Sequence, residues 1–200
     1  MKPRTGIHFA AALAGLGFML TPSPRESAAT LVLAGGCFWG VEAVFEHVRG
    51  VQSVTSGFAR PADATAEFVP VEAVRVVYDP SVVTPSQLLA IFYTVAHDPT
   101  SRDRQGPDAG AEYRAIVFFQ SDAFRGVAEK YAAELTHTKQ FVRPLVTELR
   151  PLGTFAVAES FHQDYSSRHP NDRYVVINDV PKVAKLKERY PALYQEQRAP

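Results

Sequence analysis

The only cysteine and the only tryptophan of this 200-residue chain lie two positions apart, in the run Gly-Gly-Cys-Phe-Trp-Gly at residues 35–40. A strand-like apolar segment (30–34) precedes the run, and apolar side chains recur at helical spacing after it. Cys37 is therefore predicted at a strand-to-helix turn, where free N–H groups and the helix dipole favour a thiolate. Phe38 and Trp39 would offer a small, weakly polar group an apolar setting. A buried, inert thiol is the alternative, because free cysteines are usually core residues.

The segment around Cys37, continued by Glu42, resembles the Gly-Cys-Phe-Trp-Gly signature of the A-type peptide methionine sulfoxide reductases, and further matches extend over residues 30–195. The resemblance implies an oxidoreductase that reduces the S epimer of methionine sulfoxide, free or in oxidised proteins, and so repairs oxidative damage. It also implies that the Cys37 thiolate attacks the sulfoxide and becomes a cysteine sulfenic acid.

Sulfoxide reduction also requires an acid that protonates the departing oxygen, and Glu72 is the carboxyl predicted to do so. On a strand over residues 71–78 it shares a face with Val74 and Val76, so desolvation would favour its neutral, proton-donating form. A solvated glutamate at the start of a strand is the alternative. The resemblance implies the catalytic role, because the family's acid heads a strand that ends in Tyr-Asp-Pro, as residues 72–80 do.

The resemblance implies three further site residues. Residues 104–114 resemble the family's Arg-Gln-Gly-x-Asp-x-Gly-x-Gln-Tyr-Arg, whose Asp and Tyr line the active site and correspond to Asp108 and Tyr113. Tyr113 is expected to hydrogen-bond the sulfoxide oxygen, and Asp108 to orient water or substrate. His162, in a His-Gln-x-Tyr segment, is expected to donate a hydrogen bond to the Cys37 loop. A turn-forming aspartate, a half-buried strand tyrosine and a structural histidine are the alternatives.

The chain departs from the family where the second strand ends. The family has Gly-Tyr-x-Gly-Gly there, and this chain has Phe58 within Gly-Phe-Ala-Arg-Pro (57–61), followed by a shorter loop. Phe58 is expected to line the substrate site with its ring but to lack a hydroxyl for the sulfoxide oxygen. Because other donors remain, the expected loss of rate is smaller than the roughly 10²–10³ that removal of a lone donor costs.

A single cysteine determines how the enzyme must be recycled. No second thiol of the chain can reduce a Cys37 sulfenic acid, so an external thiol is expected to do so, either a thioredoxin-like protein or a small thiol. No prosthetic cofactor is expected. The histidines are scattered and show no zinc-ligand spacing, so no metal is expected.

Basic and acidic residues balance at 21 each, so the charge gives no indication of a nucleic-acid partner. Residues 1–29 combine an early basic pair, a short apolar run and a small-residue end, which predicts a secretory signal peptide. We therefore expect an exported, periplasmic or secreted protein with one catalytic domain over residues 30–200. The apolar run is too short for a stable membrane span. A lipid anchor on Cys37 is the alternative, and the protein is expected to be a monomer.

Hydrophobic periodicity gives the order β-α-β-β-α-β-α-β, which predicts an α/β (α+β) fold with a ferredoxin-like plait core and extra C-terminal segments. Helices are expected after Cys37, Thr84 and Ser121, and over residues 181–190. The last core strand, at residues 145–150, is expected to be short and near an edge because prolines bracket it.

Two other functions remain open. A cysteine-dependent acyl transferase would use Cys37 with His162, although no protease-type signature surrounds the cysteine. A catalytically weakened protein that binds methionine sulfoxide without turnover would follow if Phe58 and the shortened loop abolish the reaction.

Overall fold

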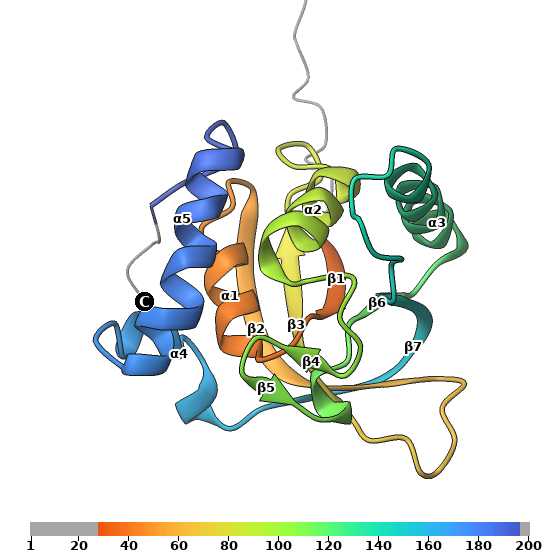
Figure 1. Ribbon diagram of the computed structural model, residues 1–200, viewed down its shortest axis with the longest axis horizontal. Helices are drawn as coiled ribbons and strands as arrows, with labels where there is room; N and C mark the ends of the chain where they lie inside the picture. Colours follow the sequence, from red (N-terminus) through yellow and green to blue (C-terminus); the bar gives the residue numbers. More distant parts are fainter. Residues whose placement is uncertain (1–27, 197–200) are drawn as a thin grey trace, which may run out of the picture.

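In the computed structural model, which describes residues 28–196, five strands form a closed barrel with helices against its outer side (Figure 1). The barrel strands are β1 (Ala29–Ala34), β2 (Val51–Pro61), β3 (Val71–Tyr78), β6 (Ile116–Phe119) and β7 (Glu148–Val157). The helices are α1 (Phe38–Glu46), α2 (Pro85–Ile91), α3 (Asp122–His137), α4 (Tyr165–Arg168) and α5 (Val180–Arg189). A small hairpin outside the barrel consists of β4 (Arg104–Gln105) and β5 (Asp108–Ala109).

None of the helices within residues 28–196 is both long and apolar enough to cross a bilayer. The predicted signal peptide, residues 1–29, lies outside the described residues except for its last two positions.

The mixed α/β prediction is confirmed, but the sheet is not the open plait that was expected. Its strand order is β1-β3-β2-β7-β6, in which β7 pairs antiparallel with β2 and parallel with β6, and the antiparallel pair of β6 with β1 closes the sheet. The strand predicted at residues 145–150 is found at Glu148–Val157 and is ten residues long; its first four residues pair with β6 and its remaining part pairs with β2. Pro151 is tolerated because it occupies the last pair of the β6–β7 ladder, where a missing N–H interrupts little.

Strand alternation divides the apolar side chains into two clusters. On β3, Val74 and Val76 belong to the larger cluster beneath the helices, whereas Val71 and Ala73 belong to a smaller cluster on the other side of the sheet. Glu72 has the parity of Val74 and Val76. The alternation therefore turns its carboxyl toward the side of the sheet on which α1 packs.

Several helix boundaries follow directly from the sequence. Thr84 and Gln87 form a capping box at the predicted start of α2, and the Ser121 hydroxyl accepts the Phe124 N–H at the predicted start of α3. Tyr113 does not lie on a strand: it ends a 3₁₀ turn (Ala111–Tyr113), and β6 begins three residues later. The turn forms because the Tyr113 N–H donates to the carbonyl of Gly110 instead of a neighbouring strand.

Candidate active site

Cys37 is the N-cap residue of α1, at the predicted turn between β1 and the helix. The turn requires a glycine before it: Gly36 has φ +90°, and a Cβ there would lie 2.4 Å from Cβ of Gln105. Cys37 as a whole residue is 8% exposed. The β4 residue Gln105 is held by two hydrogen bonds to the backbone of Asp98, so the loop above the turn is fixed.

Glu72 lies directly beside this turn. Its Oε2 accepts the N–H of Phe38 at 3.0 Å, and α1 has no other side-chain cap. Burial raises the pKa of Glu72 to about 7, and nearby Asp108 and Glu112 raise it too, while the Phe38 hydrogen bond opposes the shift. Glu72 lies on β3, 35 positions after Cys37 in the sequence. It therefore places a carboxyl group with a pKa near 7 at the N-terminus of α1.

Tyr174 is a site residue that the sequence reasoning missed. Its hydroxyl donates to Oδ2 of Asp108 at 2.5 Å, and it also lies within hydrogen-bonding reach of the Cys37 thiol. The carboxylate of Asp108 therefore holds the Tyr174 hydroxyl beside the sulfur of Cys37. Burial and the neighbouring negative charges raise the pKa of Tyr174, so its hydroxyl stays protonated. The segment around Tyr174 carried only an irregular apolar pattern, and no motif distinguished this tyrosine from the others.

The resting thiol is not the thiolate that the helix position predicts. Burial, reinforced by the charge of Glu72, raises the pKa of Cys37 to about 12. Hydrogen bonds from the Tyr174 hydroxyl and from the backbone N–H of Trp39 lower the pKa of Cys37, but they offset only part of this rise. Desolvation outweighs the helix N-terminus here because the sulfur is almost fully enclosed.

The indole of Trp39 is fixed by the C-terminal part of the chain. It stacks on Tyr165 with ring centroids 3.7 Å apart, and its Nε1–H donates to Nδ1 of His162 at 3.3 Å. His162 was expected to donate to the Cys37 loop, but it accepts a hydrogen bond from the neighbouring indole instead. The histidine therefore orients an aromatic wall of the site.

Phe38 and Phe58 form the rest of that wall. Their rings meet edge to face at 5.6 Å, and Phe58 is the direct cross-strand neighbour of Glu72. Phe38 is fully buried, so Phe58 and Trp39 are the half-exposed aromatics of the group.

Tyr113 lies close enough to Glu72, Asp108 and Cys37 for their charges to affect its pKa. Desolvation raises the pKa of Tyr113 to about 12, and the charges of Glu72, Asp108 and Cys37 contribute. Its hydroxyl is therefore a proton-bearing donor at neutral pH. Cys37, Glu72, Asp108 and Tyr113 thus lie near one another in the structure, and Tyr174 lies with them.

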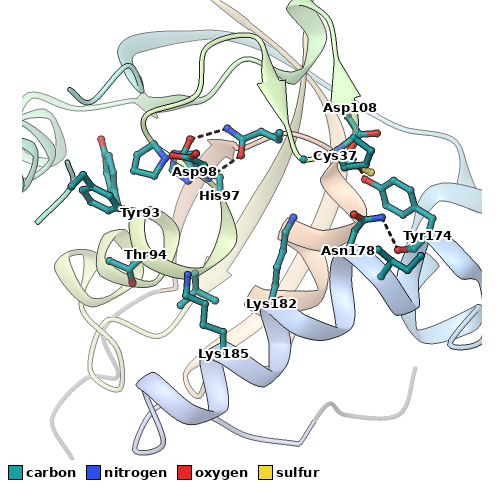
Figure 2. A pocket seen from close by; sticks show the side chains of 17 residues that line it. Cys37, Tyr93, Thr94, His97, Asp98, Asp108, Tyr174, Asn178, Lys182 and Lys185 are labelled. Carbon is teal, nitrogen blue, oxygen red and sulfur yellow. Dashed lines mark hydrogen bonds between the residues drawn. The ribbon is translucent and has the colours of Figure 1, made fainter. Parts of the chain in front are cut away.

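A cavity of about 400 Å³ opens beside the sulfur. Figure 2 shows Cys37, Asp108 and Tyr174 together at one end of it, with Lys182 and Lys185 reaching in from α5. The arrangement supports thiol chemistry on a small group that needs both an acid and neutral hydroxyl donors.

Comparison with known protein families gives one clear match. The family model for peptide methionine sulfoxide reductase matches residues 29–193. Peptide methionine sulfoxide reductase MsrA 2 of Mesorhizobium japonicum is 44% identical over 175 residues, which cover 84% of this chain and 90% of that protein. MsrA of Thermus thermophilus is 41% identical over 178 residues, which cover 85% of this chain and 98% of that protein.

Solved structures show the same likeness. Methionine sulfoxide reductase A of Corynebacterium diphtheriae is 31% identical with a TM-score of 0.58, covering 74% of this chain and 77% of that one. Reduced Mxr1 of Saccharomyces cerevisiae is 26% identical with a TM-score of 0.63, covering 77% of this chain and 92% of that one. Mxr1 has also been solved in complex with Trx2.

Proposed function

The chain belongs to the peptide methionine sulfoxide reductase family and is an oxidoreductase that reduces methionine sulfoxide to methionine, and we propose that Cys37 is its nucleophile and Glu72 its acid. The observation that carries the proposal is the hydrogen bond from the Phe38 N–H to Glu72, which fixes a carboxyl beside the thiol. Burial holds the pKa of that carboxyl near 7, so it can bear the proton that the reaction needs.

In the proposed reaction, Glu72 protonates the sulfoxide oxygen and the sulfur of Cys37 attacks the substrate sulfur. The oxygen passes to Cys37, the sulfoxide becomes the thioether of methionine, and the cysteine becomes a sulfenic acid. The thiol proton replaces the one that Glu72 gave. The cysteine is oxidised by two electrons and the substrate is reduced by two.

The high pKa of the resting thiol fits this order of events. Protonating the sulfoxide places positive charge on the sulfur next to Cys37, and an opposite charge at that distance favours the thiolate. The thiol is therefore activated only when substrate and acid are both in place. An unoccupied enzyme keeps Cys37 protonated, which protects it from oxidation.

In this proposal the Tyr113 hydroxyl donates a hydrogen bond to the sulfoxide oxygen, and the Tyr174 hydroxyl donates one to the sulfur of Cys37. Tyr113 and Tyr174 both keep their protons at neutral pH. Phe58 contributes only its ring, beside Trp39, to the pocket for the methyl group. We further propose that the enzyme prefers the S epimer of the sulfoxide, in oxidised proteins or as the free amino acid.

The chain has one cysteine, so we propose that an external thiol, such as a thioredoxin-like protein, returns the sulfenic acid to the thiol. We also propose export of the protein as a monomer, directed by residues 1–29. N-terminal sequencing of the protein from the periplasm or medium tests export, and sedimentation tests the monomer.

A single-turnover experiment tests the proposed chemistry. The reduced protein is mixed with the separated epimers of a methionine sulfoxide peptide and no thiol. One equivalent of methionine and one added oxygen on Cys37 are expected from the S epimer, and Cys37→Ser should give neither.

Two other outcomes would identify the alternatives. Binding of the sulfoxide peptide without an oxygen added to Cys37 would indicate a protein that no longer turns over. Covalent labelling of Cys37 by an activated ester would indicate acyl transfer, although His162 is bonded to Trp39 rather than placed as a base for the thiol.

A further inference from the structure

The cavity beside Cys37 extends away from the residues that handle the sulfoxide. Glu72, Tyr113, Trp39 and Phe58 do not line it. We call it the lysine pocket: Cys37, Asp108 and Tyr174 lie at one end, and the side chains of Lys182 and Lys185 enter it from α5 (Figure 2). Cys37 therefore borders this cavity in addition to lying beside Glu72.

The lysine pocket has cationic groups that no internal partner neutralises fully. Within residues 28–196, Lys182 and Lys185 form no salt bridge. The two lysines are three residues apart, so they project from one face of the helix. Lys182 also lies near the buried carboxyl of Asp179, whereas Lys185 is exposed to the pocket and to solvent.

The acidic residues of the pocket are already engaged. Asp98 forms a salt bridge of 2.8 Å with Arg143 and accepts hydrogen bonds from Thr100. Asp108 accepts the hydroxyl of Tyr174. An incoming anion would therefore meet the ammonium groups at the α5 end of the pocket and a reactive sulfur at the other.

We propose that the lysine pocket binds the reducing thiol, and that this thiol is a small molecule carrying a carboxylate. The proposal rests on the proposed function, because a chain with one cysteine needs a thiol from outside. The volume of about 400 Å³ falls in the range of small-molecule sites. The lysines hold the carboxylate while the thiol group reaches Cys37.

The chemistry needs an approach on the side away from Glu72. The incoming thiolate attacks the sulfur of Cys37 sulfenic acid, an S–S bond forms, and the S–O bond breaks in line with it. The hydroxide takes a proton from Glu72 and leaves as water. A second molecule of the thiol then attacks the mixed disulfide, releasing the oxidised dimer of the thiol and free Cys37.

Charge selectivity among simple thiols tests the proposal. We compare 3-mercaptopropionate, 2-mercaptoethanol and cysteamine as reductants of the full chain, with wild type and the double variant Lys182→Gln, Lys185→Gln. The ratio of wild-type to variant kcat/KM for one thiol cancels the intrinsic reactivity of that thiol. We expect the variant to lose roughly fivefold or more with the anionic thiol, to change little with the neutral one, and to gain with the cationic one.

The control is Lys187→Gln, on the same helix but paired with Glu196 and outside the pocket, which should leave all three ratios near one. Added salt should reduce the advantage of the anionic thiol in wild type only.

Three results would overturn the proposal: an equal loss with all three thiols, a change confined to the KM for the sulfoxide, or a loss seen only with a thioredoxin protein. Single-turnover formation of the sulfenic acid separates this failure from failure of the proposed function. If the sulfenic acid forms and no charge selectivity appears, only the lysine pocket is wrong.

Discussion

Tyr174 donates a 2.5 Å hydrogen bond to Asp108, 66 residues away in the sequence, and this bond holds the tyrosine hydroxyl beside the Cys37 thiol. The hydroxyl has one proton to donate, so it can turn from the carboxylate to the sulfur when a thiolate forms. Asp108 therefore acts on the sulfur through Tyr174.

Tyr174→Phe removes this donor and should raise the pKa of Cys37 further, because the Tyr174 hydrogen bond lowers it. Alkylation of the variant by iodoacetamide should be slower than that of wild type at every pH between 7 and 10. Single-turnover reduction should slow by roughly 10²-fold. Tyr165→Phe is the control, since its ring stacks on Trp39 and should keep doing so. Unchanged alkylation in Tyr174→Phe would contradict the role of the hydroxyl.

Glu72→Gln should remove the proton-donating carboxyl group, while the amide oxygen of Gln can still accept the Phe38 N–H, so the variant should fold. The rate of sulfoxide reduction should fall by roughly 10²–10⁴. In wild type the protonated carboxyl is the active form, so the rate should decline as pH rises through the pKa of Glu72, about 7. Stopped-flow single turnovers across pH 5–9 measure both effects. A variant that keeps the wild-type rate and pH profile would remove Glu72 from the mechanism.

Phe58→Tyr should add a hydroxyl next to Glu72, its cross-strand partner. We expect the single-turnover rate to rise by up to about tenfold, less than the value of a lone donor because the Tyr113 hydroxyl remains. Phe155→Tyr serves as the control, since that ring lies on β7 against Arg75. A lower rate in Phe58→Tyr with unchanged thermal stability would show that the site has been reshaped around the phenylalanine.

The stability of the fold should depend on pH through Glu42 and Glu46. Carboxyl oxygens of these residues and Asp164 lie within 4.8 Å of one another, and burial raises the pKa of Glu42 to about 7 and of Glu46 to about 8. The folded state therefore holds protons that the unfolded chain releases above its ordinary pKa. This contribution is complete below about pH 4.5 and is lost as pH rises through 7 and 8.

Thermal unfolding at a series of pH values checks this dependence. The midpoint should fall between pH 5.5 and 8.5, and Glu46→Gln should flatten the decline because its amide does not titrate. A midpoint that rises over the same interval in wild type would contradict the assignment. Glu129→Gln, on an exposed face of α3, is a suitable control.

The sequence predicted those parts of the site that depend on local pattern. The glycine turn gave the position of Cys37, and alternation along β3 gave the face of Glu72. Tyr174 was out of reach because its place depends on how a long irregular segment returns to α1. The thiol was expected to ionise because the helix terminus is visible in the sequence, whereas the desolvation that opposes it comes from packing.

In the fold, too, the features set by local sequence were predictable and those set by long-range pairing were not. Capping residues such as Thr84 and Ser121 marked helix starts correctly, since their hydrogen bonds are made within one turn. The closure of the barrel could not be inferred, because β7 pairs with a strand that begins 97 residues earlier (Val51 to Glu148). Flanking prolines made β7 resemble an edge strand, but long-range pairing overrides that local signal.

The strand that seals the barrel leads directly into the segment that carries His162 and Tyr165. During synthesis, the earlier strands and α1 emerge well before β7, so Cys37 exists for a time without His162 and Tyr165, the residues that fix Trp39 beside it. Sequence-distant pairings such as β2 with β7 form slowly. The order of assembly therefore leaves Cys37 exposed at first and encloses it last. In refolding, protection of Cys37 from alkylation should appear together with enzymatic activity, later than the first secondary structure.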